Sequence, residues 1–295
     1  MNTLISAIGF GIASGAVIAL GALGFTLQFG LSNTLNIAYG GFITVAAFLG
    51  YGLIQLGLNP WVTMALTGLA VAALSVLYYR GLIRGLMRRG IGLGSIVIAT
   101  VAAGIFIEYA VLAAAGPDVK SYGQTSGSTF HLGSVTLTST QVAIIAVAAI
   151  LMLVLHLLLR LTQLGKALRA TAVNRTLARS CGIRTERVTL GAWLVSGLLC
   201  GVAGVALAMT TQSFDFTLGA TFLISVIAAA VVGGIGQPYG AMLGGLIIGI
   251  TTEVSAAYWS PAYSNVIAFG LLVAILLVRP VGLLGSQARR HEVAG

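Results

Sequence analysis

The first 79 residues of this chain contain no Asp, Glu, Lys or Arg. Over all 295 residues, 58% of the side chains are hydrophobic and 7% are charged, whereas about a quarter of the residues of a soluble globular domain are charged. A helix that crosses a bilayer needs about 20 apolar residues, so the chain has room for about eight to ten such helices. We therefore expect an all-α fold, a polytopic transmembrane helix bundle with room for discontinuous segments.

Nine apolar runs are candidates for these spans, and the polar sequence between them is too short for a soluble domain. The longest loop expected outside the membrane, Gly116–Ser139, is rich in Gly, Ser and Thr. Residues 1–295 are therefore interpreted as a single transmembrane domain. The expected spans are Leu4–Leu27, Leu35–Leu56, Trp61–Ile83, Ser95–Ala115, Thr140–Leu159, Val188–Met209, Gly219–Val232, Ala241–Tyr258 and Ala262–Val278.

The basic residues indicate how the bundle is oriented. Fourteen of the fifteen Lys and Arg lie in three clusters, Arg80–Arg89, Arg160–Arg187 and Arg279–Arg290. Alternating spans place all three on one side, which the positive-inside rule assigns to the cytoplasm. We expect a multi-pass protein of the cell inner membrane, with its N-terminus outside and its C-terminus inside. The net charge of +9 then serves membrane anchoring, so the lipid bilayer is an expected partner and nucleic acid is not.

Two apolar runs are interrupted by glycine and polar residues, at Phe29–Gly41 and at Val232–Gly245. Non-helical backbone inside a membrane is tolerated where protein or water satisfies its polar groups, and paired interruptions of this kind indicate a transport pathway. The alternative is two interfacial turns whose glycines permit close helix packing. On the first interpretation, the translocation pathway contains Asn33, Asn36, Tyr39, Gly40, Gly41, Gly233, Gly234, Gly236 and Gln237.

Polar side chains within the apolar runs are the other candidates. Asn33, Asn36 and Tyr39 are spaced three apart and would share one face of a helix, where they could bind a polar solute or hold helices together. Glu108 lies inside an apolar run, and an intramembrane carboxylate is a candidate functional group, so we add it to the pathway. Glu253 lies near the end of an apolar run, where the free-energy cost of placing a carboxylate in the membrane is small. So few carboxylates give ion-coupled transport little support.

No catalytic group is expected in this chain. The three histidines, His131, His156 and His291, are dispersed. The phosphate-binding motif G-x-x-x-x-G-K-[ST] is absent, because Gly165-Lys166 is followed by alanine. We therefore expect a chain that is not an enzyme and that holds no metal or cofactor.

The stretch Arg160–Arg187 holds seven of the fifteen basic residues and one carboxylate. From Lys166 to Cys181 it contains no Gly or Pro, and its Ala, Leu and Arg favour a helix. Gly182 stands where a left-handed glycine ends a helix. The loop therefore predicts one cytoplasmic helix that fits a groove of another protein. A helix lying on the membrane surface is the alternative, weakened because two leucines are its only bulky apolar residues.

This loop resembles that of the inner-membrane permeases of the branched-chain amino-acid ABC transporter family, in which G-x-A-L-R-A-x-A and a following A-x-x-x-G-I engage the ATPase. Three other stretches are similar to motifs of that family: Leu35–Gly40 to N-x-A-H-G, Gly233–Gly245 to G-G-I-G followed by G-A-M-x-G-G, and Arg279–Gly285 to R-P-x-G-L-L-G. Tyr39 stands where the family usually carries His, and a phenol does not titrate near neutral pH. The resemblance assigns ATPase coupling to Gly165, Lys166, Ala167, Leu168, Arg169, Ala172, Ala178, Gly182 and Ile183.

The resemblance implies a membrane-spanning subunit of an ABC importer that translocates branched-chain or related amino acids by alternating access. The partners it implies are a second, related permease subunit, two cytosolic ATPase subunits that carry ATP and Mg, and an extracytoplasmic solute-binding protein. The residues themselves also leave open an ATP-independent secondary carrier or channel for small polar solutes such as urea or amides.

Overall fold

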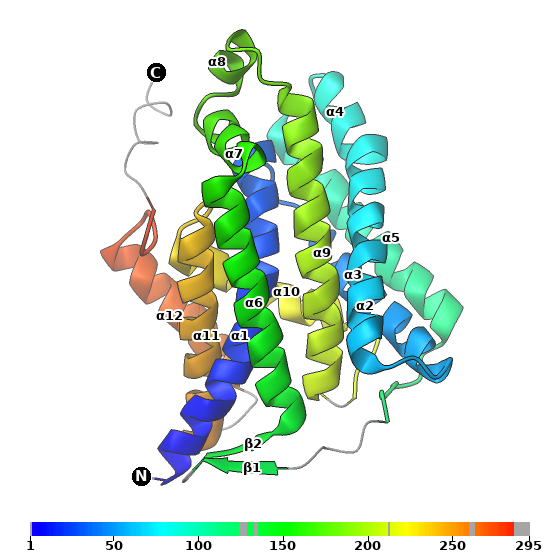
Figure 1. Cartoon of the computed structure of the whole chain (residues 1–295), viewed down its shortest axis with the longest axis vertical. Helices are drawn as coiled ribbons and strands as arrows, with labels where there is room; N and C mark the ends of the chain where they lie inside the picture. Colours follow the sequence, from blue (N-terminus) through cyan, green and yellow to red (C-terminus); the bar gives the residue numbers. More distant parts are fainter. Residues whose placement is uncertain (1, 124–128, 133–134, 212, 260–262, 286–295) are drawn as a thin grey trace.

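The computed structural model describes the whole chain except residues 1, 124–128, 133–134, 212, 260–262 and 286–295. The described residues form a bundle of helices with one short hairpin (Figure 1). Its elements are α1 (Asn2–Ser32), α2 (Tyr39–Gln55), α3 (Pro60–Tyr78), the π-helical turn η1 (Tyr79–Ile83), α4 (Arg84–Arg88), α5 (Leu93–Ala115), β1 (Thr129–Leu132), β2 (Val135–Thr138), α6 (Ser139–Leu161), α7 (Gln163–Val173), α8 (Arg175–Ser180), α9 (Thr185–Thr211), α10 (Leu218–Gly233), α11 (Pro238–Tyr258) and α12 (Ser264–Val278).

Each of the nine predicted apolar runs contains one helix, so the predicted all-α bundle is confirmed. Among the described residues, six helices are long and apolar enough to cross a membrane, namely α1, α3 with its continuation through α4, α5, α6, α9 and α11. The helices α2 and α10 and the apolar part of α12 are shorter than this. The helices α2, with 17 residues, and α10, with 16 residues, adjoin the two interruptions. Each is shorter than the roughly 20 residues that a helix needs to cross a bilayer.

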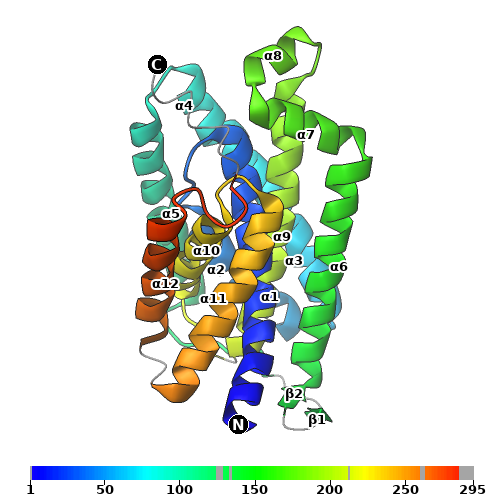
Figure 2. The ribbon, with the colours of Figure 1, turned by 90° about the vertical axis from the view of Figure 1, so that its left-hand side faces the viewer.

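The interior of the bundle is built around α1, which packs against α9, α10 and α11 (Figures 1 and 2). Glycines permit the closest of these contacts. A Cβ at Gly249 of α11 would lie 2.2 Å from the Cα of Gly15, and a Cβ at Gly245 would lie 2.4 Å from the Cα of Ala19. Gly245 and Gly249, four residues apart, therefore form a small-xxx-small pair that permits α1 and α11 to pack closely.

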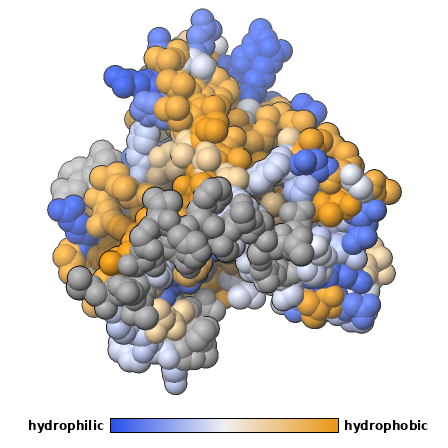
Figure 3. Space-filling view, turned by 60° about the horizontal axis from the view of Figure 1, so that its bottom comes forward, coloured by the Kyte–Doolittle hydropathy of each residue, from blue (hydrophilic) through white to orange (hydrophobic). Residues whose placement is uncertain are grey.

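The outer surface of the bundle is apolar. Hydrophobic residues cover much of its side in Figure 3, and hydrophilic residues gather at the upper edge of that view. Large exposed side chains stand on α5 (Ile98 and Phe106), on α6 (Leu153) and on α12 (Leu277). Exposed apolar surface of this extent is typical of contact with lipid or with another subunit.

The two ends of the bundle differ in charge. The helices α4, α7 and α8, which hold five of the thirteen arginines, lie together at one end, which we call the basic end. The N-terminus and the β-hairpin lie at the other end (Figure 1). There Lys120 and Phe214 exchange two backbone hydrogen bonds, and the Tyr122 hydroxyl donates to the Ala47 carbonyl over 2.9 Å. The predicted alternation of spans agrees with this arrangement; which compartment each end faces stays a prediction.

Candidate functional site

The first interruption of the helices lies between Ser32 and Tyr39, where α1 ends and α2 begins. Asn33 has a φ of 51°, a left-handed conformation that Asn tolerates better than most residues. The prediction that Asn33, Asn36 and Tyr39 share a helix face is wrong, because both asparagines lie outside the helices. The local signal for this was the Ser-Asn pair, whose side chains compete with helical hydrogen bonds.

Gly40 and Gly41 lie in the first turn of α2 and not in the interruption. Each permits a close helix contact. A Cβ at Gly40 would lie 3.0 Å from the carbonyl oxygen of Gly219 in α10, and a Cβ at Gly41 would lie 3.0 Å from the side chain of Ile107 in α5. In this conformation both glycines therefore serve packing.

The second interruption lies between Gly233, where α10 ends, and Pro238, where α11 begins. Gly234 and Gly236 have φ values of 105° and 87°, which favour glycine over any residue with a Cβ. Gln237 is half-buried beside them. The two interruptions are neighbours in space, because the Cβ position of Gly30 lies 3.6 Å from the Cα of Gly236.

The segment Arg279–Gly285 is hydrogen-bonded through its backbone to the end of α10, at the second interruption. The backbone amides of Leu283 and Leu284 donate to the carbonyls of Val232 and Gly233 over 2.9 and 3.1 Å. These carbonyls belong to the last turn of α10, where helical partners are lacking. Three stretches far apart in the sequence thus meet at one place, and their order along the chain does not reveal this.

A chain of buried polar groups leads from the first interruption into the bundle. The Asn36 amide donates to Gln28 Oε1 over 2.9 Å, and Gln28 Nε2 donates to Ser75 Oγ over 3.5 Å. Ser75 Oγ in turn donates to the Trp193 carbonyl over 3.0 Å. This polar chain connects the segment before α2 with α1, α3 and α9.

Gln28 and Ser75 are not among the site residues predicted from the sequence. The available signal was an amide and a hydroxyl within the charge-free first 79 residues, since polar side chains in apolar helices hydrogen-bond across helices.

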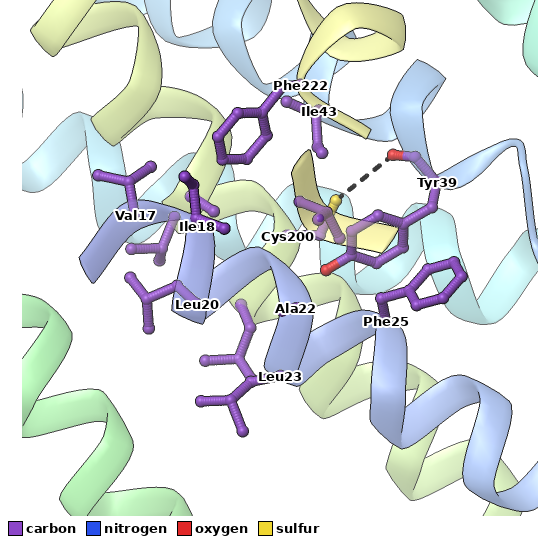
Figure 4. Packing of buried hydrophobic residues seen from close by; sticks show 14 of the residues in the cluster. Val17, Ile18, Leu20, Ala22, Leu23, Phe25, Tyr39, Ile43, Cys200 and Phe222 are labelled. Carbon is purple, nitrogen blue, oxygen red and sulfur yellow. Dashed lines mark hydrogen bonds between the residues drawn. The ribbon is translucent and has the colours of Figure 1, made fainter. Parts of the chain in front are cut away.

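Tyr39 lies in the interior of the bundle (Figure 4). Its hydroxyl donates to the Gly21 carbonyl over 2.9 Å, and its ring stands edge-on to Phe25 with 5.7 Å between the centroids. The Cys200 thiol contacts the Tyr39 carbonyl at 3.8 Å. In this conformation the phenol attaches α2 to α1.

Glu108 is half-buried on α5. It stands four and eight residues after Gly104 and Thr100, which both contact the 35–38 segment, so it lies on the α5 stripe that faces α2. No described residue donates a hydrogen bond to its carboxylate or pairs with it. Glu253 differs, because its Oε1 accepts from Ser14 Oγ across the α1–α11 contact over 2.7 Å.

The basic loop forms two helices, which corrects the prediction of one helix over Lys166–Cys181. Asn174 has an extended backbone with φ −150° and ψ 106°, and its side chain accepts from the Leu177 amide over 2.9 Å as the N-cap of α8. The absence of Gly and Pro does not exclude a break in a helix, because Asn is among the strongest N-caps. The predicted end at Gly182 is confirmed: its φ is 82°, and the amides of Gly182 and Ile183 bond back to the Arg179 and Ala178 carbonyls.

The coupling candidates divide into buried and exposed residues. Leu168 and Ala178 are buried against the bundle, whereas Lys166 is exposed; Ala167, Ala172 and Ile183 are half-buried. A Cβ at Gly165 would lie 2.3 Å from the Leu159 carbonyl oxygen. Arg169 Nη1 donates to the same carbonyl over 2.6 Å. Gly165 and Arg169 therefore attach α7 to the end of α6, and α7 is fixed to the bundle rather than free.

Metal-ligating residues do not gather in the described part of the chain: no group of three His, Cys, Asp or Glu is found there. His156 stacks edge-on with Tyr239, at 5.5 Å between ring centroids, and His131 lies in β1. His291 lies outside the described residues.

Sequence comparison identifies the family. The family model described as "Branched-chain amino acid transport system / permease component" matches residues 7–276. The chain belongs to this family. It is therefore an ABC-transporter permease by descent and a multi-pass helical membrane protein, as the resemblance of its motifs predicted.

Several characterised permeases are similar to it over most of their length. The permease is 30% identical over 93% of both chains to the high-affinity branched-chain amino acid transport system permease protein LivH of Escherichia coli. It is 29% identical to BraD of Pseudomonas aeruginosa, over 93% of this chain and 94% of that protein. LivM of Salmonella typhimurium, a second permease protein of such a system, is 29% identical over 89% of this chain and 66% of LivM.

Proposed function

We propose that this permease is a membrane-spanning subunit of an ABC importer that carries branched-chain or related amino acids across the inner membrane by alternating access. Membership of the permease family supports this, as do the names of LivH and BraD. The observation that carries the proposal is the meeting of the two helix interruptions, because non-helical backbone at membrane depth is the usual site of solute passage in transporters.

The proposed partners follow from the same family membership. LivH and LivM supply the precedent for two related permeases in one system, so a second permease would pack on the apolar outer faces. Two cytosolic ATPases would bind ATP and Mg and contact α7 and α8, and this chain would hold no cofactor. A solute-binding protein would dock at the end that carries the β-hairpin and would supply most of the substrate specificity.

The pathway would follow the surface beside Asn33 rather than the centre of this subunit. The largest fully buried side chains of the bundle include Trp193, Tyr39 and Phe25, and they fill its interior. Asn33 is exposed and Glu108 is half-exposed. A pathway between two permease subunits would bring such groups to a polar solute, and the Glu108 carboxylate would attract the ammonium group of an amino acid.

The polar chain offers a physical route between the ATPases and this pathway. The helix α9 starts three residues after Gly182 and runs unbroken for 27 residues. Ser75 is bonded to α9 at Trp193 and lies beside Gln28, which accepts from Asn36. A displacement of α8 would thus be carried along α9 to the segment before α2.

The test is transport in proteoliposomes that contain the full chain, a second permease and the ATPases, with the binding protein added outside. We expect uptake of labelled leucine, isoleucine or valine that requires ATP and stops when the ATPase is inactivated. Uptake by this chain alone, driven by an ion gradient, would instead establish the secondary carrier. ATP-dependent uptake of urea or amides and not of amino acids would contradict the substrate proposed.

A further inference from the structure

A hollow lined by arginines lies at the basic end, between η1 and α4 on one side and α8 and the start of α9 on the other. Its volume is about 680 Å³. We call it the basic hollow. Leu190 of α9 lines it together with six charged residues, Arg80, Arg84, Arg179, Arg184, Arg187 and Glu186.

Two of the five guanidinium groups already have partners. Arg84 forms an ion pair with Glu186, which joins α4 to α9, and Arg179 Nε donates to Thr185 Oγ1 over 2.9 Å. The side chains of Arg80, Arg184 and Arg187 have no partner among the described residues. The hollow is thus held in shape by two side-chain contacts and presents three unpaired positive charges.

The height of the hollow along the helices matches the edge of a bilayer. At 1.5 Å per residue, α3 rises about 30 Å from Pro60 to Arg80, which is about the thickness of the hydrocarbon core. On α9, Arg187 is followed at once by the apolar run that ends near Met209. The arginines of the hollow therefore stand where lipid phosphates would lie.

Apolar surface continues from the hollow toward the membrane core. Leu190 lines the hollow, and Leu194, one helical turn further along α9, is 47% exposed. Leu77, three residues before Arg80 on α3, is 65% exposed. A ligand that fits this surface has an anionic head and a hydrocarbon tail.

We propose that the basic hollow binds the phosphate head of an anionic phospholipid, with its acyl chains against Leu77 and Leu194. Guanidinium groups bind phosphate oxygens in pairs and more strongly than neutral donors do, and basic pockets between transmembrane helices suit anionic head groups. An acidic surface of a protein partner is the other anion to consider. It is disfavoured because it would leave the adjoining leucines uncovered. The bound lipid would hold the α8–α9 junction against α4 and so influence how α8 moves.

The experiment measures binding of phosphatidylglycerol and of phosphatidylcholine to the full chain, purified with any subunits that remain bound, by native mass spectrometry. The test variant is Arg80→Gln with Arg184→Gln. The matched control is Arg88→Gln with Arg89→Gln, which removes the same charge at exposed positions outside the hollow. At about fivefold in affinity for each basic residue, we expect the test variant to bind phosphatidylglycerol about 25-fold more weakly and the control to stay within about threefold of wild type.

A further variant, Arg80→Lys with Arg184→Lys, separates the effect of positive charge from that of the paired guanidinium donors. It keeps the charge but loses the paired donors, so its affinity should lie between those of wild type and the glutamine pair. Equal losses in the test and control variants would overturn the proposal, because charge alone would then explain binding. Displacement of the lipid by inorganic phosphate, with equal thermal stabilisation, would indicate a free-anion site and also overturn it. Unchanged lipid binding with loss of an ATPase subunit would identify a protein contact instead.

Discussion

Replacing Gln28 and Asn36 with leucine, singly and together, tests the buried polar chain most directly. The Gln28–Asn36 bond is 2.9 Å long and buried at both ends. In Gln28→Leu, the Asn36 amide loses its acceptor and remains buried. In Asn36→Leu, Gln28 Oε1 loses its donor. The double variant removes both polar groups, so neither is left unpaired.

The magnitudes follow from this geometry. Each single substitution leaves one buried polar group without a partner, which costs about 1–3 kcal/mol in the free energy of unfolding. The double variant should cost less than the sum of the two. Measured coupling between such groups in membrane proteins averages about 0.6 kcal/mol and reaches about 1.7. We expect about 1 kcal/mol, because this bond is short and fully buried.

The assay is a double-mutant cycle on unfolding in sodium dodecyl sulfate, with Gln55→Leu, an exposed glutamine at the end of α2, as the matched control. The same variants are then compared for ATP hydrolysis and for uptake in the assembled transporter. We expect the double variant to be about 1 kcal/mol more stable than the sum of the two single effects predicts, and to hydrolyse ATP with little uptake. Additive single effects would refute the contact, and wild-type uptake by the double variant would refute its part in transport.

Three further perturbations test other parts of the structure. Arg169→Glu combined with Gly182→Leu removes the anchor of α7 and strains a residue with φ 82°; uptake should fall severalfold while ATP hydrolysis persists, and normal uptake would exclude the assigned coupling. Gly249→Leu should destabilise the α1–α11 contact by about 1–3 kcal/mol or more in the same unfolding assay, whereas Gly270→Leu on α12, whose Cβ would meet nothing within 4 Å, should not. Burial raises the pKa of the Tyr122 phenol in the loop between α5 and β1 above its usual value of 10.0, so its contribution to stability is complete below about pH 10 and is lost as the pH rises further. Tyr122→Phe should therefore lose less stability than wild type between neutral and strongly alkaline pH, and identical alkaline losses would contradict this.

The sequence predicted those features that depend on a few neighbouring residues. Apolar runs identified all nine apolar helices, because a bilayer admits few other structures. Gly182 was identified as a helix end because a left-handed residue there favours glycine. The break at Asn174 is equally local, because Asn is among the strongest N-caps and can start a new helix where Gly and Pro are absent. The motifs also indicated the family, since each is a short pattern in a fixed order.

Only the tertiary structure decided which of these segments meet. The contact of Gly30 with Gly236, the bonds of Leu283 and Leu284 to α10, and the approach of Gln28 to Ser75 join residues that lie far apart in the chain. No local propensity encodes such contacts, because each is the result of how whole helices pack. The same holds for Tyr39, whose phenol is equally suited to a pathway or to an interior. The packing of α2 against α9 and the contacts of Tyr39 with Gly21 and Phe25 of α1 bury it. The sequence alone determined that this chain is a helical membrane permease, and the packing of its helices determined which polar groups are paired inside it and which are left for a ligand or a partner.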